Sequence, residues 1–190
     1  GYTEPIDSLL NGSGYQPDSR MPGYGAPYLL LRLIMSMHAA IQGLVLLQVL
    51  ASAFGVVLLA KLAYKLTDDP RVFRWTYWLA LLAIFSSFYD RFILTESFSA
   101  AALVFVVYAI ITLPRSKGYP RILTAGAAMA WLIFMKPVFL PLLAVFGLYL
   151  LLTRKDAGWT RLLCSALFCM PFLLADGIWI ARNAMLHDVF

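Results

Sequence analysis

Long apolar stretches, separated by short polar breaks, follow one another along most of this chain. Residues 1–28 come first and are polar and rich in glycine and proline, so we expect a loop with one short surface helix there. Six apolar runs follow, at about 38–60, 75–89, 97–113, 122–135, 138–152 and 162–180. Their apolar positions are continuous and do not alternate with polar ones, which favours helices over the strands of a membrane barrel. The pattern predicts an all-α, polytopic integral membrane protein with about six transmembrane helices behind a polar outer N-terminal loop.

The composition agrees with this interpretation and excludes a soluble domain. Hydrophobic residues make up 62% and charged residues 13% of the 190 positions, and the mean hydropathy is +0.78. A soluble domain has about 45–50% apolar and about 25% charged residues. We therefore expect one transmembrane domain over 1–190, with the outer loop and an interfacial helix in 1–37 and the membrane helices in 38–190.

The net charge of the chain is +5. When the apolar runs are placed alternately across a membrane, the charged residues fall into two sets, one on each side. One side carries ten Lys or Arg and three Asp, a net charge of +7, and the other carries five Lys or Arg and seven Asp or Glu, a net charge of −2. The basic side is cytoplasmic by the positive-inside rule, so the charge is an orientation signal and not a nucleic-acid patch. We expect a multi-pass protein of the bacterial inner membrane whose breaks at 90–96 and 136–137 face the periplasm or exterior.

The outer side gathers ionisable residues next to helix ends, where such groups are functional candidates because they are costly at membrane depth. Glu96 opens the third run; it is either a functional carboxylate or a helix N-terminal carboxylate paired with Arg91. Lys136 lies between two runs of about 14 or 15 residues, too short to span a bilayer alone, so it is either held in an outer cavity or snorkels to the interface. Arg20 in the outer loop and Arg182 at the end of the last run also belong to this set.

Several familiar chemistries are absent from the sequence. No glycine-rich phosphate loop, nucleophile elbow or HExxH motif occurs, and His38 and His187 have no companions at zinc-ligand spacing. Cys164 and Cys169 lie on different faces of one predicted helix and are poorly placed to bridge each other. A reaction on the outer side would lack cytoplasmic nucleotides and would need a donor carried in the lipid.

Motifs in a fixed order along the chain resemble one family. Three stretches near the start of the chain are Tyr2-x-Glu4-Pro5, 9–15 and 20–24. In this order they resemble the first outer loop of polytopic GT-C glycosyltransferases. The similar members are of the dolichyl-phosphate-mannose protein mannosyltransferase and lipid A aminoarabinose transferase type. The second crossing of the family resembles 48–53. The family patterns RFxLTE, LT(K/R)P and WxxRN are similar to 91–97, 134–138 and 179–183.

The resemblance implies a sugar donor on a polyprenyl phosphate and an acceptor that is a lipid, a glycan or a protein. It implies an inverting displacement in an outward cavity, with a carboxylate of the first outer loop as base. Glu4 and Asp18 are candidates for that base, and Glu96 would position the acceptor, the donor sugar or a divalent cation, Mg or Mn. Cationic side chains would hold the lipid phosphate and other parts of the substrate. The expected substrate-binding residues are Arg20, Tyr24, Arg91, Lys136 and Arg182.

The chain departs from the family pattern at one point. The loop Asp of the family usually lies just before the Gly-Tyr that opens this sequence, so we expect the base upstream of Gly1, behind a further helix. We accordingly expect a piece of a longer protein that is inactive by itself. Two other function classes stay open: a transporter or flippase for a lipid-linked sugar, which would show internal repeats that we do not find, and a non-catalytic membrane scaffold.

Overall fold

The structure is a computed structural model that describes residues 3–13, 22–83, 95–113, 118–153 and 158–187. Every regular element in these residues is a helix, which confirms the all-α prediction for the described part of the chain. In chain order the helices are α1 (Glu4–Leu10), η1 (Pro22–Tyr24), α2 (Gly25–Arg32), α3 (Met37–Thr67), α4 (Pro70–Leu81), α6 (Glu96–Ile111), α7 (Tyr119–Met135), η2 (Pro137–Phe139), α8 (Leu140–Thr153) and α9 (Gly158–His187).

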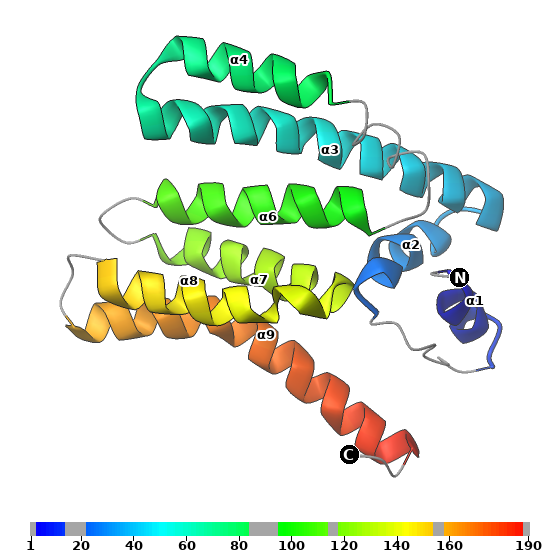
Figure 1. The fold of residues 1–190 in the computed structure, drawn as a ribbon. Coiled ribbons are helices and arrows are strands. Elements are labelled where there is room, and N and C mark those ends of the chain that lie inside the picture. The colour runs from blue at the N-terminus through cyan, green and yellow to red at the C-terminus, as the bar shows by residue number, and fades with distance from the viewer. Residues whose placement is uncertain (1–2, 14–21, 84–94, 114–117, 154–157, 188–190) are drawn as a thin grey trace.

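The long helices lie side by side in a bundle, and the first two short helices lie across one end of it (Figure 1). Neighbouring pairs run from α4 to α3, α6, α7 and then α9, with α8 against α9. The second half of α9 projects beyond the bundle (Figure 1). Pro171 lies inside this helix and removes one of its backbone hydrogen bonds, which is a common cause of a bend.

Two helices are long and apolar enough to cross a membrane: α3, with a hydropathy of 2.4 over its best window, and residues Gly158–Met185 of α9, with 1.8. Only 28% and 17% of these windows are buried inside the protein, so most of their apolar side chains face outward. The shorter apolar helices α6 and α7, and the stretch Pro137–Thr153, do not reach that length. Membrane association is thus indicated by two helices, and the six crossings stay a prediction.

Capping residues move several helix boundaries away from the ends of the apolar runs. The chain turns at Asp68, whose φ of 57° is left-handed, and α3 therefore reaches Thr67. Asp69 then accepts a hydrogen bond from the Arg71 backbone N–H at 2.7 Å, and Pro70 occupies the first helical turn, so α4 begins before the predicted run at 75–89. The outer stretch is more helical than predicted, since α1, η1 and much of α2 lie within 1–28.

One glycine sets how closely two central helices approach. A Cβ atom at Gly126 of α7 would lie 2.3 Å from the carbonyl oxygen of Phe168 of α9, a distance that no side chain tolerates. Phe168 itself is fully buried, and with Met129 and Ile122 it forms part of the core between these helices. The close contact between α7 and α9 therefore depends on the absence of a side chain at Gly126.

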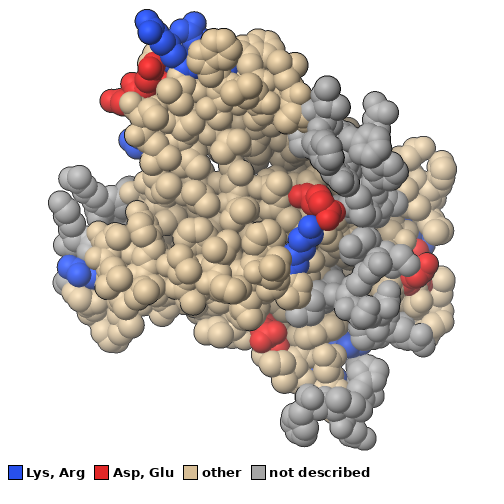
Figure 2. Space-filling model, viewed as in Figure 1, with Lys and Arg blue, Asp and Glu red and all other residues tan. Residues whose placement is uncertain are grey.

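The charged residues of the described helices lie at opposite ends of the bundle. The end where α3 meets α4, and where α7 and α9 begin, carries Lys61, Lys65, Arg71, Arg74, Arg121 and Arg161. The other end carries the start of α6, the end of α7, α1 and α2 (Figure 1). Figure 2 shows cationic side chains at the first end, some of them next to acidic ones, and separate patches of acidic and cationic side chains toward the other end.

Candidate functional site

Glu96 and Lys136 meet at the end of the bundle that was predicted to face outward. Lys136 Nζ donates a hydrogen bond to Glu96 Oε1 at 2.8 Å, and the two side chains are 30% and 44% exposed respectively. Glu96 is the first residue of α6, where a carboxylate is favoured by the helix dipole. Lys136 is thus a partner of Glu96 in the structure; the pairing with Arg91 that the sequence suggested stays a prediction, because Arg91 lies outside the described residues.

The backbone at Lys136 explains how its side chain leaves the helix. Pro137 follows it, and a residue before proline is driven out of the helical region by steric contact with the proline ring. Lys136 accordingly has φ −146° and ψ 102°, extended values that end α7. The ammonium group is thereby placed beside α6, where it holds a partly exposed ion pair that a phosphate group could reach.

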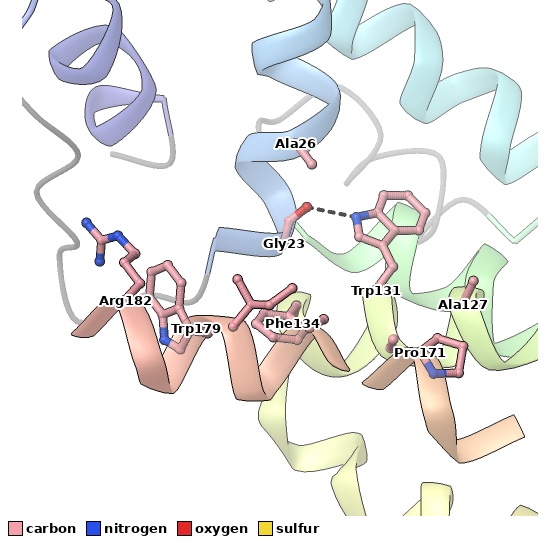
Figure 3. Close-up of a pocket in the computed structure, with 11 residues that line it drawn as sticks. Gly23, Ala26, Ala127, Trp131, Phe134, Pro171, Trp179 and Arg182 are labelled. Atoms are coloured by element: carbon pink, nitrogen blue, oxygen red, sulfur yellow. Dashed lines mark hydrogen bonds between the residues drawn. The ribbon is translucent and has the colours of Figure 1, made fainter. Parts of the chain in front are cut away.

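A groove of about 560 Å³ opens between η1 and α2 on one side and α7 and α9 on the other (Figure 3), and neither Glu96 nor Lys136 lines it. Its walls are mostly apolar, with Trp131 and Phe134 from α7, and Ile178 and Trp179 from α9. Arg182 supplies the charged group of the lining and stands next to Trp179 at one end of the groove (Figure 3).

Two polar contacts fix the ends of the groove. The Trp131 Nε1–H donates to the Gly23 carbonyl oxygen at 2.8 Å, which ties α7 to η1. The Arg182 guanidinium carbon lies 5.0 Å from the centre of the Trp179 ring, and its Nη1 donates to Asn183 Oδ1 at 2.8 Å. A guanidinium stacked on an indole is held in one orientation, which suits it to bind an anion.

Aromatic packing links the groove to the ion pair. Phe98, two residues after Glu96, lies 5.5 Å between ring centres from Trp131 of the groove wall. Phe134, also in the wall, precedes Lys136 by two residues in α7. Helices α6 and α7 thus contribute both to the ion pair and to the packing of the groove wall, and the pair and the groove are two separate candidate features of these helices.

Tyr24 does not face this site. Its side chain is 1% exposed, and its hydroxyl donates to Oε1 of the fully buried Gln48 of α3 at 2.9 Å. The substrate contact that the resemblance implied for Tyr24 stays a prediction, and in the structure the side chain is buried against α3. Gly23 beside it packs so closely that a Cβ atom would lie 2.4 Å from the backbone carbon of Phe134. The first contact holds η1 against α3, and the second places η1 directly against α7.

A second anchor, which the sequence did not reveal, joins α1 to α2. The Asp7 carboxylate accepts hydrogen bonds from the Tyr28 hydroxyl and from Arg32 Nε, both at 3.1 Å to Oδ1. Burial and the acidic partner raise the pKa of the Tyr28 hydroxyl. Spacing could not predict this cluster, because its members lie 21 and 25 residues apart in an irregular region.

Of the remaining predicted residues, the structure describes only some. Glu4 is exposed at the start of α1, at the same end of the molecule as Glu96. Asp18 and Arg20 lie outside the described residues. Among the residues that the structure describes, no group of three His, Cys, Asp or Glu side chains could hold a metal ion.

Comparisons with family models, with curated proteins and with solved structures found no match to this chain.

Proposed function

We propose that the protein is a membrane glycosyltransferase of the GT-C type, which transfers a sugar from a polyprenyl-phosphate donor on the outer side of the membrane. The observation that supports the proposal is an apolar groove with the Arg182 guanidinium in its lining, in a bundle whose helices α6 and α7 also carry the Glu96–Lys136 pair. A lipid-linked sugar needs both parts, a dry channel for its chain and cations for its phosphate. The volume of about 560 Å³ lies within the range of small-molecule sites.

In the proposed complex the prenyl chain lies along the Trp131 and Phe134 wall, and its phosphate lies near Arg182 and Lys136. The ammonium of Lys136 exchanges its contact with Glu96 for one with the departing phosphate, whose negative charge grows as the bond to the anomeric carbon breaks. Glu96, freed from the ion pair, then accepts a hydrogen bond from a sugar or acceptor hydroxyl. A carboxylate of the outer loop removes the acceptor proton, and Glu4 and Asp18 remain the candidates within this chain.

The test uses the protein as its gene encodes it, purified and reconstituted with radiolabelled polyprenyl-phosphate sugars and membrane-lipid acceptors. Loss of a charge-assisted contact is worth about 1.5–3 kcal/mol, so Glu96→Gln, Lys136→Met and Arg182→Gln should each lower the transfer rate roughly 10- to 100-fold. Arg121→Gln and Arg161→Gln remove a cation at the opposite end of the bundle and serve as matched controls that leave transfer unchanged.

The alternatives give different results in the same vesicles. A transporter or flippase would move the labelled lipid across the membrane without transferring its sugar. A scaffold would do neither. If the Glu96 and Lys136 variants kept full transfer with normal folding, the site assignment would be wrong even if the enzyme class were right.

A further inference from the structure

A second hollow lies on α4, at the end of the bundle opposite the groove. It has a volume of about 350 Å³ and is lined by Arg71, Arg74, Trp75 and Trp78. These positions follow the spacing i, i+3, i+4, i+7, which places them on one face of a helix. Two guanidinium groups thus stand beside two indole rings on a single surface.

This face has no protein partner in the described part of the chain. The helix packs against α3, and none of its residues is buried. Trp75 is 68% exposed and Trp78 is 53% exposed. Exposed tryptophan side chains are favoured at the boundary of a bilayer, where the ring contacts the apolar region and its N–H group contacts water or lipid headgroups.

The nearby acidic side chains do not satisfy the two arginines. Asp69 accepts its hydrogen bond from the backbone N–H of Arg71, so that oxygen is used in capping α4. No ion pair of either guanidinium with Asp68 or Asp69 occurs at 4.0 Å or less in the structure, where these four residues are all described. Both cationic groups therefore remain able to bind an anion.

We propose that this hollow binds the headgroup of an anionic phospholipid in the leaflet at the basic end of the bundle. The phosphate pairs with Arg71 and Arg74, and the indole rings of Trp75 and Trp78 pack against the glycerol region and the first part of the acyl chains. This proposal rests on one part of the proposed function, namely that the protein is embedded in a membrane. It does not depend on sugar transfer. A phospholipid fits better than a soluble anion because half of the lining is apolar.

Native mass spectrometry of the detergent-solubilised full protein tests this site with phosphatidylglycerol, phosphatidylcholine and inorganic phosphate as three separate probes. A Lys or Arg near a membrane surface contributes about 1 kcal/mol, or roughly fivefold in affinity, so Arg71→Gln with Arg74→Gln should weaken phosphatidylglycerol retention about 25-fold. The pair Arg121→Gln and Arg161→Gln removes the same charge at the same end and should change it less than about threefold.

The tryptophans have their own control. Trp75→Ala with Trp78→Ala should weaken retention of phosphatidylglycerol, whereas Trp159→Ala, which removes an indole that is 76% exposed at the start of α9, should not. Equal losses in the control variants, or equal binding of inorganic phosphate, would overturn the proposal. Circular dichroism of each variant verifies its helix content. Failure of sugar transfer with preserved lipid selectivity would contradict only the proposed function.

Discussion

The close approach of α7 and α9 gives a sharp test of the packing. In Gly126→Ala the new Cβ would lie 2.3 Å from the Phe168 carbonyl oxygen, and 3.0 and 3.1 Å from the Phe168 carbonyl carbon and Cα. Carbon and oxygen atoms in contact normally lie about 3.3 Å or more apart, so the helices must separate locally by roughly 1 Å. All three contacting atoms are backbone, and no side-chain rotation relieves the contact.

The magnitude is the difference between two opposing effects. Overpacking of this kind costs about 1–3 kcal/mol. Replacing glycine by alanine inside a helix returns up to about 1 kcal/mol. With the full offset, the net loss of unfolding free energy should be about 0–2 kcal/mol, but relative to a Gly→Ala variant with free space around the new Cβ it should be about 1–3 kcal/mol, or roughly 2–12 °C in Tm for a protein of this size.

Gly177→Ala is the matched control, because Gly177 lies inside α9 and a Cβ atom there meets nothing within 4 Å. It should leave the Tm unchanged or raise it by a few degrees. Thermal unfolding followed by circular dichroism in one detergent compares the two variants with the parent protein. If Gly126→Ala were as stable as Gly177→Ala, the helices would not meet at this position and the α7–α9 arrangement would be wrong.

Three further predictions concern the site end of the bundle. A double-mutant cycle of Glu96→Gln and Lys136→Met, read by denaturant unfolding, should give a coupling of about 0.2–1 kcal/mol because both side chains are partly exposed; zero coupling would argue against the pair. Tyr24→Phe should lower the unfolding free energy by about 1–2 kcal/mol through loss of the buried bond to Gln48, and an unchanged value would contradict the anchor. The raised pKa of Tyr28 means that its contribution to stability is complete below about pH 10 and is lost as the pH rises through the folded pKa. The Tm should therefore fall more steeply above pH 10 in the parent protein than in Tyr28→Phe, and parallel profiles would refute the assignment.

Much of the helical arrangement could be predicted because it depends on neighbours in sequence. Continuous apolar runs predicted helices over most of the lengths observed, and the short runs on either side of Lys136 predicted the paired helices α7 and α8. The boundaries were less accurate because they depend on capping, as at Asp69 and Pro70, where a single side chain extends a helix beyond its apolar part.

For the candidate site, the sequence predicted individual residues but not how they are arranged. Glu96, Lys136 and Arg182 were identified singly, because ionisable residues beside apolar runs are unusual in any sequence. The contact between Glu96 and Lys136 was not predicted, because the two residues lie 40 positions apart in the chain. An outward cavity was expected from the resemblance, but the residues that line the groove were not predicted, since they come from segments far apart in the chain and look like ordinary helix faces.

The sequence by itself determined the all-helical character of the described residues and the apolar surface of the helices. It also determined that the basic residues gather in one of the two alternating sets of connections between helices. These properties follow from hydrophobicity and from capping within a few residues. Only the tertiary structure decided that Glu96 meets Lys136, that Tyr24 is buried against Gln48, and that a groove opens between η1, α2, α7 and α9. Those features depend on how closely backbones approach, and the approach is set by contacts such as Gly126 against Phe168 and Gly23 against Phe134, between residues that sequence order does not bring together.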